Sequence, residues 1–143
     1  MANKFASGFY RPTHPEKYLG KTLPTYRSSW ELTLMRVFDS HPSVVGWASE
    51  PIQIPYQDPS SGRWRAYIPD FLLVYIDAKG VKHGEVIEVK PARQTLESAA
   101  KTKRDRAAIA INTAKWQAAQ AWCSNSGLRF RVMTEAEIFR NAR

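Results

Sequence analysis

Two stretches of the chain carry apolar residues at three- and four-residue steps, the period of an amphipathic helix. The first begins at Ser28, a residue type that caps helix N-termini, and ends before Pro42. The second spans residues 103–126 and is followed by Gly127, at the position of a C-terminal cap. The pattern therefore predicts a helix over 28–41 and a longer one over 103–126. The expected buried face of the longer helix carries Ala107, Ile111, Ala114, Ala118 and either Ala121 or Trp122.

Between these helices the apolar residues form short runs bounded by turn residues, which indicates β-strands. Strands are expected over residues 44–47, 52–56, 64–68, 71–76 and 84–90. The turn residues at 58–62 join the second and third of these strands as a hairpin. A strand over 129–133 and a final short helix, opened by a capping box at 134–137, complete the chain. This order of elements predicts an α/β fold with a mixed central sheet flanked by helices.

Residues 1–27 differ from the rest of the chain in composition. They carry five basic residues and one acidic residue, together with prolines and aromatic residues. Such a stretch is typical of an extended basic arm that lies on a surface, of protein or of nucleic acid, and a solvated tail is the alternative. We therefore expect an N-terminal arm over 1–27 and a single folded domain over 28–143.

The overall composition narrows the class of protein. A chain of 143 residues can bury one modest core, and it has no apolar run long enough to span a bilayer, so no membrane partner is expected. The single cysteine, Cys123, excludes a disulfide framework and a cysteine-based zinc site. The N-terminus lacks the apolar core of a secretory signal, which predicts a cytoplasmic protein. The formal net charge of +8 favours a polyanionic partner, most simply nucleic acid.

Asp70 and Glu88 flank two predicted strands, and their relative position can be counted from the turn between these strands. Gly80 suits the left-handed last position of a three-residue hairpin loop, and Asp77 suits the opening position of a type I turn. If Asp77 pairs with the residue that follows Gly80, counting back along both strands places Asp70 directly opposite Glu88. Lys90 lies two residues beyond Glu88 and points to the same side. The sequence thus predicts two carboxylates and an ammonium group at one end of a β-ribbon.

Two facing carboxylates repel one another unless a proton or a cation lies between them. Mg²⁺ often takes one or two protein carboxylates together with waters and phosphate oxygens, and it can activate water for attack on a phosphodiester. Lys90 could stabilise the charge that develops in this reaction. These groups point to metal-dependent phosphodiester hydrolysis. The alternative is an inter-strand salt bridge on a solvated face, because acid-x-Lys triplets such as Asp77-Ala-Lys79 arise by chance.

Glu31 stands in the first turn of the first predicted helix and could reach a site on the sheet, although an acid at a helix N-terminus is also favourable by itself. An acid on a helix, followed by Pro69-Asp70 and then by Glu88-Val-Lys90, resembles the PD-(D/E)XK nuclease superfamily. Segments 26–31, 41–47, 68–71, 88–91 and 115–123 look like those of the head completion nucleases of tailed phages, over roughly residues 8–139. These nucleases are in turn similar to the transposon end-cleaving endonucleases.

The resemblance implies a restriction-endonuclease-like domain and a metal-dependent DNA endonuclease that uses Mg²⁺, or alternatively Mn²⁺. It implies that Glu31, Asp70, Glu88 and Lys90 are the catalytic residues, and that Asp70, Glu88 and the carbonyl of Val89 hold the metal. The activity it implies is cleavage of packaged phage DNA during head completion, before tail attachment. The implied partners are the phage genome and phage head or portal proteins. The implied place is the host cytoplasm during assembly, with retention in the virion as an alternative.

Basic residues around this site are expected to contact DNA, with a solvated face as the alternative. We assign DNA contact to Arg27, Arg63, Arg65, Arg93, Lys101, Lys103, Arg104 and Lys115. Trp64, which lies between two of these arginines, could stack on an unpaired base or could belong to the core. Two other functions stay open: a non-catalytic basic protein of the phage head or neck that binds DNA, and an RNA-binding module.

Overall fold

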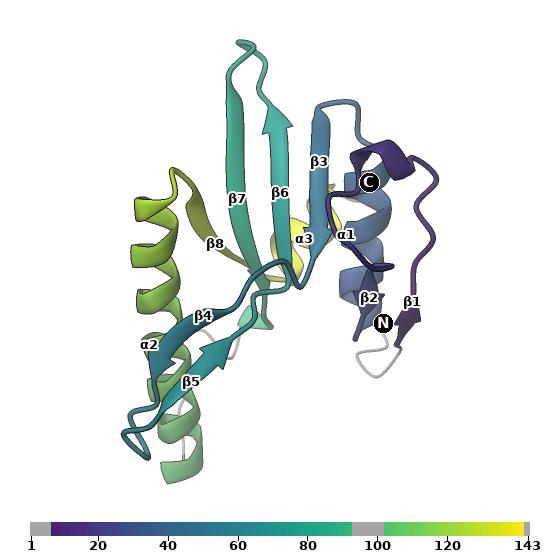
Figure 1. Cartoon of the computed structure of the whole chain (residues 1–143). Coiled ribbons are helices and arrows are strands. Elements are labelled where there is room, and N and C mark those ends of the chain that lie inside the picture. The colour runs from purple at the N-terminus through teal and green to yellow at the C-terminus, as the bar shows by residue number, and fades with distance from the viewer. Residues whose placement is uncertain (1–6, 93–101, 142–143) are drawn as a thin grey trace.

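A four-stranded central sheet organises the computed structural model, which describes residues 7–92 and 102–141 (Figure 1). Across the sheet the strands follow the order β3 (Val44–Ser49), β6 (Phe71–Ile76), β7 (Lys82–Val89) and β8 (Arg129–Met133). β6 pairs antiparallel with both β3 and β7, whereas β8 runs parallel to β7. The predicted mixed central sheet is confirmed.

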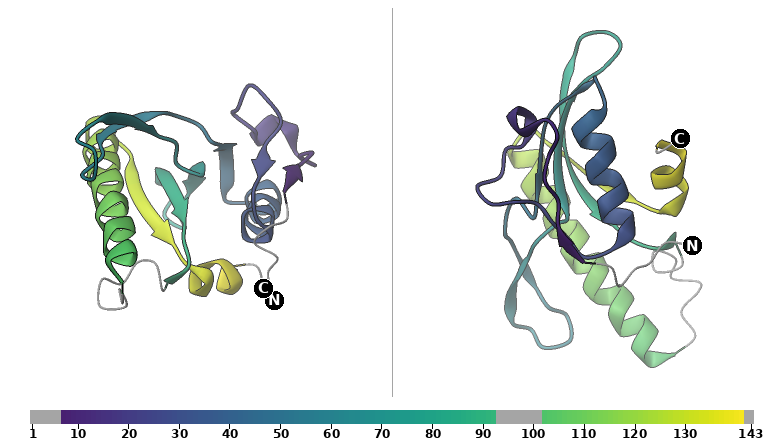
Figure 2. Two further views of the ribbon diagram at one scale, coloured as in Figure 1. Left: turned by 90° about the horizontal axis from the view of Figure 1, so that it is seen from below. Right: turned by 90° about the vertical axis from the view of Figure 1, so that its right-hand side faces the viewer.

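Helices pack on both faces of this sheet (Figures 1 and 2). The helices α1 (Ser29–Ser40) and α3 (Glu135–Asn141) pack on one face, where Trp47, Phe71 and Ile87 belong to the main core. The long helix α2 (Lys103–Asn125) connects β7 to β8 and packs with Phe130, whose side chain points to the other face. A helical crossover of this kind is what a parallel strand pair requires.

Cap residues explain where both long helices begin and end. The Ser28 hydroxyl accepts a hydrogen bond from the third residue of α1, and Thr102 forms a capping box with Asp105 at the start of α2. Gly127 follows α2 with φ +71°, the left-handed conformation that favours glycine.

Among the described residues, no helix combines the length and the apolarity needed to cross a membrane.

The buried face of α2 agrees with the predicted one except at its start. Ile111, Ala114, Ala118 and Trp122, the alternative to Ala121, pack in a core with Ala119. The prediction was wrong at Ala107, which is exposed, and it missed the buried Ala119 and Cys123, because alanines lie on several sides of this helix.

A separate two-stranded hairpin projects beyond the central sheet alongside α2 (Figure 1). It consists of β4 (Ile54–Gln57) and β5 (Trp64–Tyr67), and its residues Ile54, Tyr56 and Tyr67 form a second core with Ala119 of α2. This confirms the predicted hairpin around the 58–62 turn. We refer to residues 54–67 and 103–125 together as the lobe.

Residues 7–27 lie on the surface of the domain itself. β1 (Gly8–Phe9) pairs with β2 (Thr25–Tyr26), and the short 3-10 helix η1 (Pro15–Lys17) lies between them in the chain. Further along this segment, the ring of Tyr18 packs edge-on against Trp47, with 4.8 Å between ring centroids. The predicted division of the chain after residue 27 stays a prediction.

The β6–β7 ribbon has the predicted register. Phe71 lies opposite Ile87, and the pairing continues without a shift to the turn. At the turn the N–H of Asp77 donates to the carbonyl of Val81 at 2.9 Å, and Gly80 has φ +81°. The register therefore follows from a turn that only a residue tolerant of positive φ can close without strain.

Candidate active site

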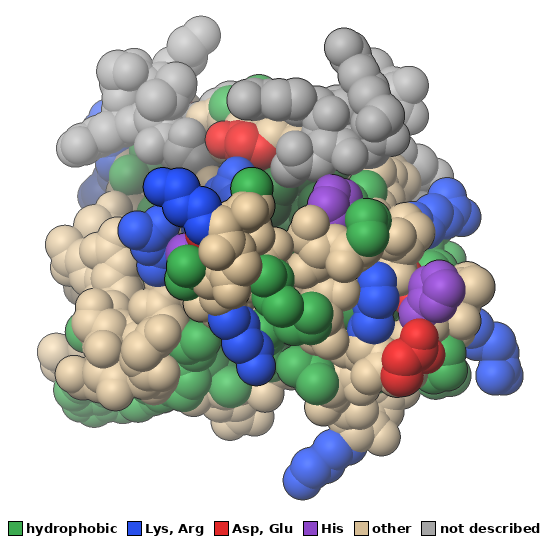
Figure 3. All heavy atoms as spheres, turned by 90° about the horizontal axis from the view of Figure 1, so that it is seen from above, with side chains coloured by type: hydrophobic (Ala, Val, Ile, Leu, Met, Phe, Trp, Pro, Cys, Tyr) green, Lys and Arg blue, Asp and Glu red, His purple; other side chains and the backbone are tan. Residues whose placement is uncertain are grey.

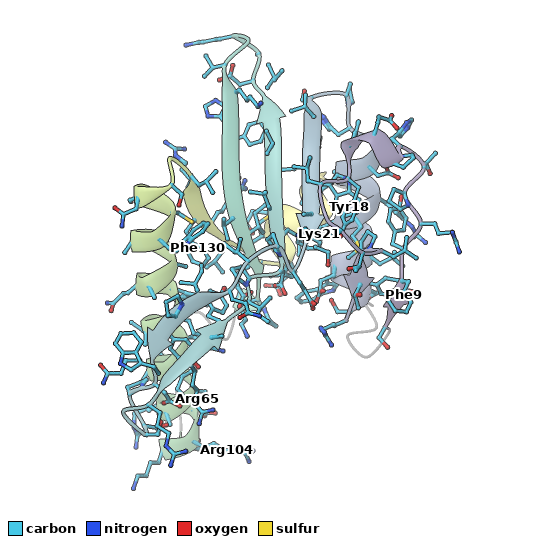
Figure 4. The ribbon with its side chains drawn as sticks, in the orientation of Figure 1. Phe9, Tyr18, Lys21, Arg65, Arg104 and Phe130 are labelled. Atoms are coloured by element: carbon cyan, nitrogen blue, oxygen red, sulfur yellow. The ribbon has the colours of Figure 1, made fainter. Side chains whose placement is uncertain are left out.

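The predicted acidic pair lies at the end of the β6–β7 ribbon that is remote from its turn. Asp70 immediately precedes β6, and one further step of the register places it opposite Glu88 on β7. The N–H of Val89 donates to Asp70 Oδ2 at 2.7 Å, which holds the Asp70 side chain against β7. Figure 4 shows side-chain oxygen atoms gathered at this lower end of the sheet, above the part of the lobe that carries Arg65 and Arg104.

Asp70 and Glu88 hold protons more tightly than isolated carboxyl groups do. Burial raises the pKa of Asp70 well above its usual value, and the negative charge of Glu88 raises it further. Burial also raises the pKa of Glu88, although its contact with Asp70 and the charge of Lys90 lower it. The two carboxyl groups therefore repel as anions and share a proton unless a cation replaces it.

Glu31 joins the pair from the first turn of α1. The main-chain N–H of Arg27 donates to Glu31 Oε1 at 3.2 Å, which turns the side chain back over the helix start. Burial raises the pKa of Glu31 to about 7, and the negative charge of Asp70 adds to this rise. The structure thus brings together all three carboxyl groups that the sequence placed at the site.

Two lysines face these acids. The charge of Lys90 lowers the pKa of both Asp70 and Glu88, as expected for a neighbouring ammonium group. Lys115 of α2 lies over the rings of Tyr56 and Tyr67, at 5.7 and 5.6 Å from their centroids, and its charge also lowers the pKa of Glu88. The aromatic rings of the hairpin therefore hold a second ammonium group next to the carboxylates.

Tyr67 belongs to the site but was not predicted from the sequence. Its side chain is buried, and its hydroxyl interacts with the Glu88 carboxylate without a hydrogen bond of good geometry. Burial raises the pKa of Tyr67 far above its usual value and the charge of Glu88 adds to this rise, which places the hydroxyl beside that carboxylate. The strand pattern predicts only that Tyr67 points inward, because its neighbour depends on how the hairpin docks.

Glu50 is a fourth acid at the site that sequence reasoning missed. Its N–H donates to the carbonyl of Asp70 at 2.9 Å, and its carboxylate accepts from Arg27 Nε at 2.7 Å. Besides burial and Asp70, the charge of Glu50 contributes to the raised pKa of Glu31. Its φ of +48° is the left-handed region, which costs a non-glycine residue about 1 kcal/mol. Such strain is common near functional sites, and the break at Glu50-Pro51 was the available sequence signal.

The residues at this site fit a hard divalent cation. Within residues 7–92 and 102–141 no group of three His, Cys, Asp or Glu side chains has metal-binding geometry, so Asp70 and Glu88 are the carboxylates that would offer oxygen donors to a cation. Mg²⁺ is commonly bound by one or two carboxylates, with waters and substrate phosphates as its other ligands. The raised pKa of both groups indicates that a positive charge between them would be favourable. The carbonyl of Val89 stays a predicted ligand.

The predicted DNA-binding residues fall in three places. Four are exposed on the lobe, namely Arg63, Arg65, Lys103 and Arg104. Arg27 and Lys115 lie beside the acids. Arg93 and Lys101 lie outside the described residues. Two of these positions thus lie beside the acids and four lie on the projecting lobe, and DNA contact stays a prediction for each of them.

The opposite end of the sheet, at the ribbon turn, carries the acid Asp77. Figure 3 shows this end, where apolar, basic and acidic side chains intermix. Asp77 at the ribbon turn is paired with His83 at 2.7 Å and accepts main-chain hydrogen bonds from Lys79 and Val81. The hydrogen bond from His83 and those from the main chain lower the pKa of Asp77. These contacts account for Asp77 as part of the ribbon turn.

Comparisons with known proteins agree with this geometry. A family model described as the TnsA-like endonuclease N-terminal domain matches residues 41–135, which include Asp70, Glu88 and Lys90. The chain is also similar to the head completion nuclease of Enterobacteria phage T4. The two are 34% identical over 140 residues, which cover 90% of this chain and 91% of the relative.

Proposed function

The chain belongs to the family of TnsA-like endonuclease N-terminal domains, and from this membership we propose that it is a metal-dependent DNA endonuclease of a tailed phage. We propose that it cuts packaged DNA during head completion, before tail attachment. The observation that carries this proposal is the buried, mutually repelling pair Asp70 and Glu88 beside Lys90. The resemblance to PD-(D/E)XK nucleases is confirmed by the family match.

Asp70 and Glu88, with the carbonyl of Val89, would hold Mg²⁺ or, alternatively, Mn²⁺. A divalent cation bound there polarises the phosphodiester and lowers the pKa of water. The protein prepares this site by burying two facing carboxylates, so a divalent cation held between them would relieve the repulsion that a proton otherwise relieves.

The neighbouring side chains handle charge and protons. The ammonium group of Lys90, on the same side as Glu88, stabilises the negative charge that develops on the phosphorus oxygens. Glu31 has a pKa of about 7, because burial and the charge of Asp70 raise it, so this group can take up or release a proton near neutral pH. Lys115 lies over Tyr56 and Tyr67 and adds a second positive charge beside Glu88.

A cleavage assay on linear, flapped and branched DNA, with Mg²⁺ or Mn²⁺, tests this function. We expect Asp70→Asn and Lys90→Ala to abolish cleavage while folding and DNA binding persist. Lys79→Ala is the matched control, because Lys79 belongs to an acid-x-Lys triplet at the other end of the same ribbon. Full cutting by both site variants would overturn the proposal.

The second candidate is a non-catalytic protein of the phage head or neck that binds DNA. The net charge of +8 favours it independently of the acids. It predicts no nicking with any metal and a binding constant that falls steeply as salt rises. For either function we propose the phage genome and head or portal proteins as partners. Both functions would act in the host cytoplasm during assembly, and retention in the virion is the alternative.

A further inference from the structure

Trp64 is a large apolar side chain that the fold leaves in solvent. It is 70% exposed and stands at the start of β5, opposite Gln57. The structure thus excludes the alternative that Trp64 belongs to the core. Its sequence neighbours are Arg63 and Arg65, whose side chains are also exposed. An exposed aromatic residue between two arginines can offer a flat apolar surface to a negatively charged ligand.

A groove runs beside Trp64 between the hairpin and α2. Its volume is about 540 Å³, which lies in the size range of small-molecule sites. Apolar and aromatic side chains make up most of its lining, with Pro55, Tyr56 and Trp64 from the hairpin and Ala118 and Trp122 from α2. Such a groove can accept flat rings rather than charged groups.

The charged residues around the groove favour a ligand whose flat rings are attached to a negatively charged backbone. The lobe holds two acids, Asp58 and Asp105, against six basic residues, namely Arg63, Arg65, Lys103, Arg104, Arg106 and Lys115. Of the two acids, Asp58 is already paired with Arg65 at 3.0 Å. Figure 4 shows Arg65 and Arg104 on the two halves of the lobe. A ligand with apolar rings on a chain of negative charges complements this surface, and an acidic nucleic-acid strand with unstacked bases has that chemistry.

The hairpin that lines the groove also reaches the acids. Trp64, which lines the groove, and Tyr67, which lies beside Glu88, mark the two ends of β5, three residues or roughly 10 Å apart. We propose that this groove binds unpaired bases of single-stranded DNA, with Trp64 as the stacking platform. The substrate would then carry a single-stranded stretch next to the cut. This last step rests on the proposed nuclease function, whereas the binding step does not.

Binding without catalysis tests the proposal. In EDTA, fluorescence anisotropy compares a labelled oligo-dT with a blunt duplex of equal length, for the wild type and for Trp64→Ala and Trp64→Phe. Base stacking on one aromatic ring accounts for roughly 5- to 100-fold in affinity. We expect Trp64→Ala to weaken oligo-dT binding by about this factor and duplex binding by less than about 2-fold, and Trp64→Phe to restore most of the loss. Quenching of tryptophan fluorescence by oligo-dT should decrease in both variants, because Trp64 is absent from them while Trp122 still lines the groove.

Phe9→Ala is the matched control, because Phe9 is 71% exposed and lies on the N-terminal segment away from the lobe (Figure 4). It should bind both DNAs like the wild type. The proposal is overturned if Trp64→Ala binds oligo-dT normally, if it loses oligo-dT and duplex equally, or if RNA of matching sequence binds more tightly than DNA. Thermal unfolding followed by circular dichroism verifies that each variant is folded.

The two proposals fail separately. If Asp70→Asn still cuts DNA while Trp64→Ala loses oligo-dT, the nuclease mechanism fails and the groove stands as a DNA-binding site. If Asp70→Asn is inactive and Trp64→Ala binds oligo-dT normally, the groove proposal alone fails.

Discussion

Asp39 and Asp70 are carboxylates at two places on the same domain, and the fold treats them in opposite ways. Asp39, near the end of α1, is 1% exposed and accepts three hydrogen bonds. These come from the hydroxyl of Tyr10 at 2.6 Å and from the N–H groups of Thr13 at 2.6 Å and His14 at 2.9 Å. Burial alone would raise the pKa of Asp39, but these donors hold it below its usual value.

Asp70 has a different surrounding. It accepts one main-chain hydrogen bond, from Val89, and faces Glu88, so burial and a like charge raise its pKa. The difference shows that the domain can fully satisfy a buried carboxylate when the group has only to hold structure together. At Asp70 and Glu88 the domain does not fully neutralise the carboxylates, and a positively charged ligand can do so.

The largest expected effects are a loss of stability at Asp39 and a loss of cleavage at Asp70. Asp39→Asn should lower the free energy of unfolding by about 2 to 4 kcal/mol, because two N–H donors and a hydroxyl lose their charged acceptor. Asp70→Asn should leave stability unchanged or raise it, since it removes repulsion with Glu88, and should abolish cleavage. Urea unfolding and a cleavage assay on the same samples measure both quantities. A stable Asp39→Asn variant, or an unstable Asp70→Asn variant, would remove the distinction.

A smaller effect is expected when one donor to Asp39 is removed. Tyr10→Phe takes away a single hydrogen bond to a charged group, which contributes about 1.5 to 3 kcal/mol. The loss should therefore be a part of that caused by Asp39→Asn. Because the two residues interact directly, adding Tyr10→Phe to Asp39→Asn should lower the free energy of unfolding by less than Tyr10→Phe does in the wild type. Additive losses in urea unfolding would show that Tyr10 contributes through packing instead.

The two sites also predict opposite pH dependence. The pKa of Glu31 rises to about 7 from its usual 4.5, so the folded state binds the proton more tightly, and stability falls as pH increases between these values. The pKa of Asp39 is lowered from 3.8, so its contribution is present above pH 3.8 and is lost as pH falls below it. In EDTA, Glu31→Gln should gain stability relative to the wild type as pH rises from 4.5 to 7. A stability difference that stays constant over this range would contradict the assigned shift.

The smallest effect is expected at Tyr67. Its buried hydroxyl lies beside the Glu88 carboxylate without a hydrogen bond of good geometry, so Tyr67→Phe removes a desolvated group without breaking a strong bond. The free energy of unfolding should stay within about 0.5 kcal/mol of the wild type or rise slightly. Tyr75→Phe is a useful control, because the Tyr75 hydroxyl donates to the buried Glu85 at 2.9 Å and its loss should cost more. A larger loss at Tyr67 than at Tyr75 would contradict this account.

The sequence was sufficient for the acidic pair because the relevant rules are local. The side-chain alternation of a strand and the positive φ at Gly80 fix the register, and the register places Asp70 opposite Glu88. The caps at Ser28 and Thr102 set the starts of the long helices by equally local contacts. Of these features, the register and the cap at Ser28 were predicted from the sequence; the second helix was predicted to begin at 103, but its cap at Thr102 was not.

The missed residues depend on contacts between distant segments. Tyr67 reaches Glu88 only because the hairpin docks across the end of the sheet, and Asp39 is buried only because residues 10–14 fold back onto α1. Glu50 combines a left-handed backbone with an ion pair to Arg27, 23 positions earlier in the chain. No period or short motif encodes such pairings, so a single sequence gives little warning of them.

The packing of residues 7–27 has a practical consequence for anyone who shortens this chain. A truncated version that starts at Ser28 would remove every donor to Asp39 and leave a bare anion inside the protein. It would also remove the guanidinium that neutralises Glu50 at the rim of the acids. The shortest version suitable for expression therefore begins before Tyr10. Affinity tags are better placed where they do not disturb the packing of this segment on the domain.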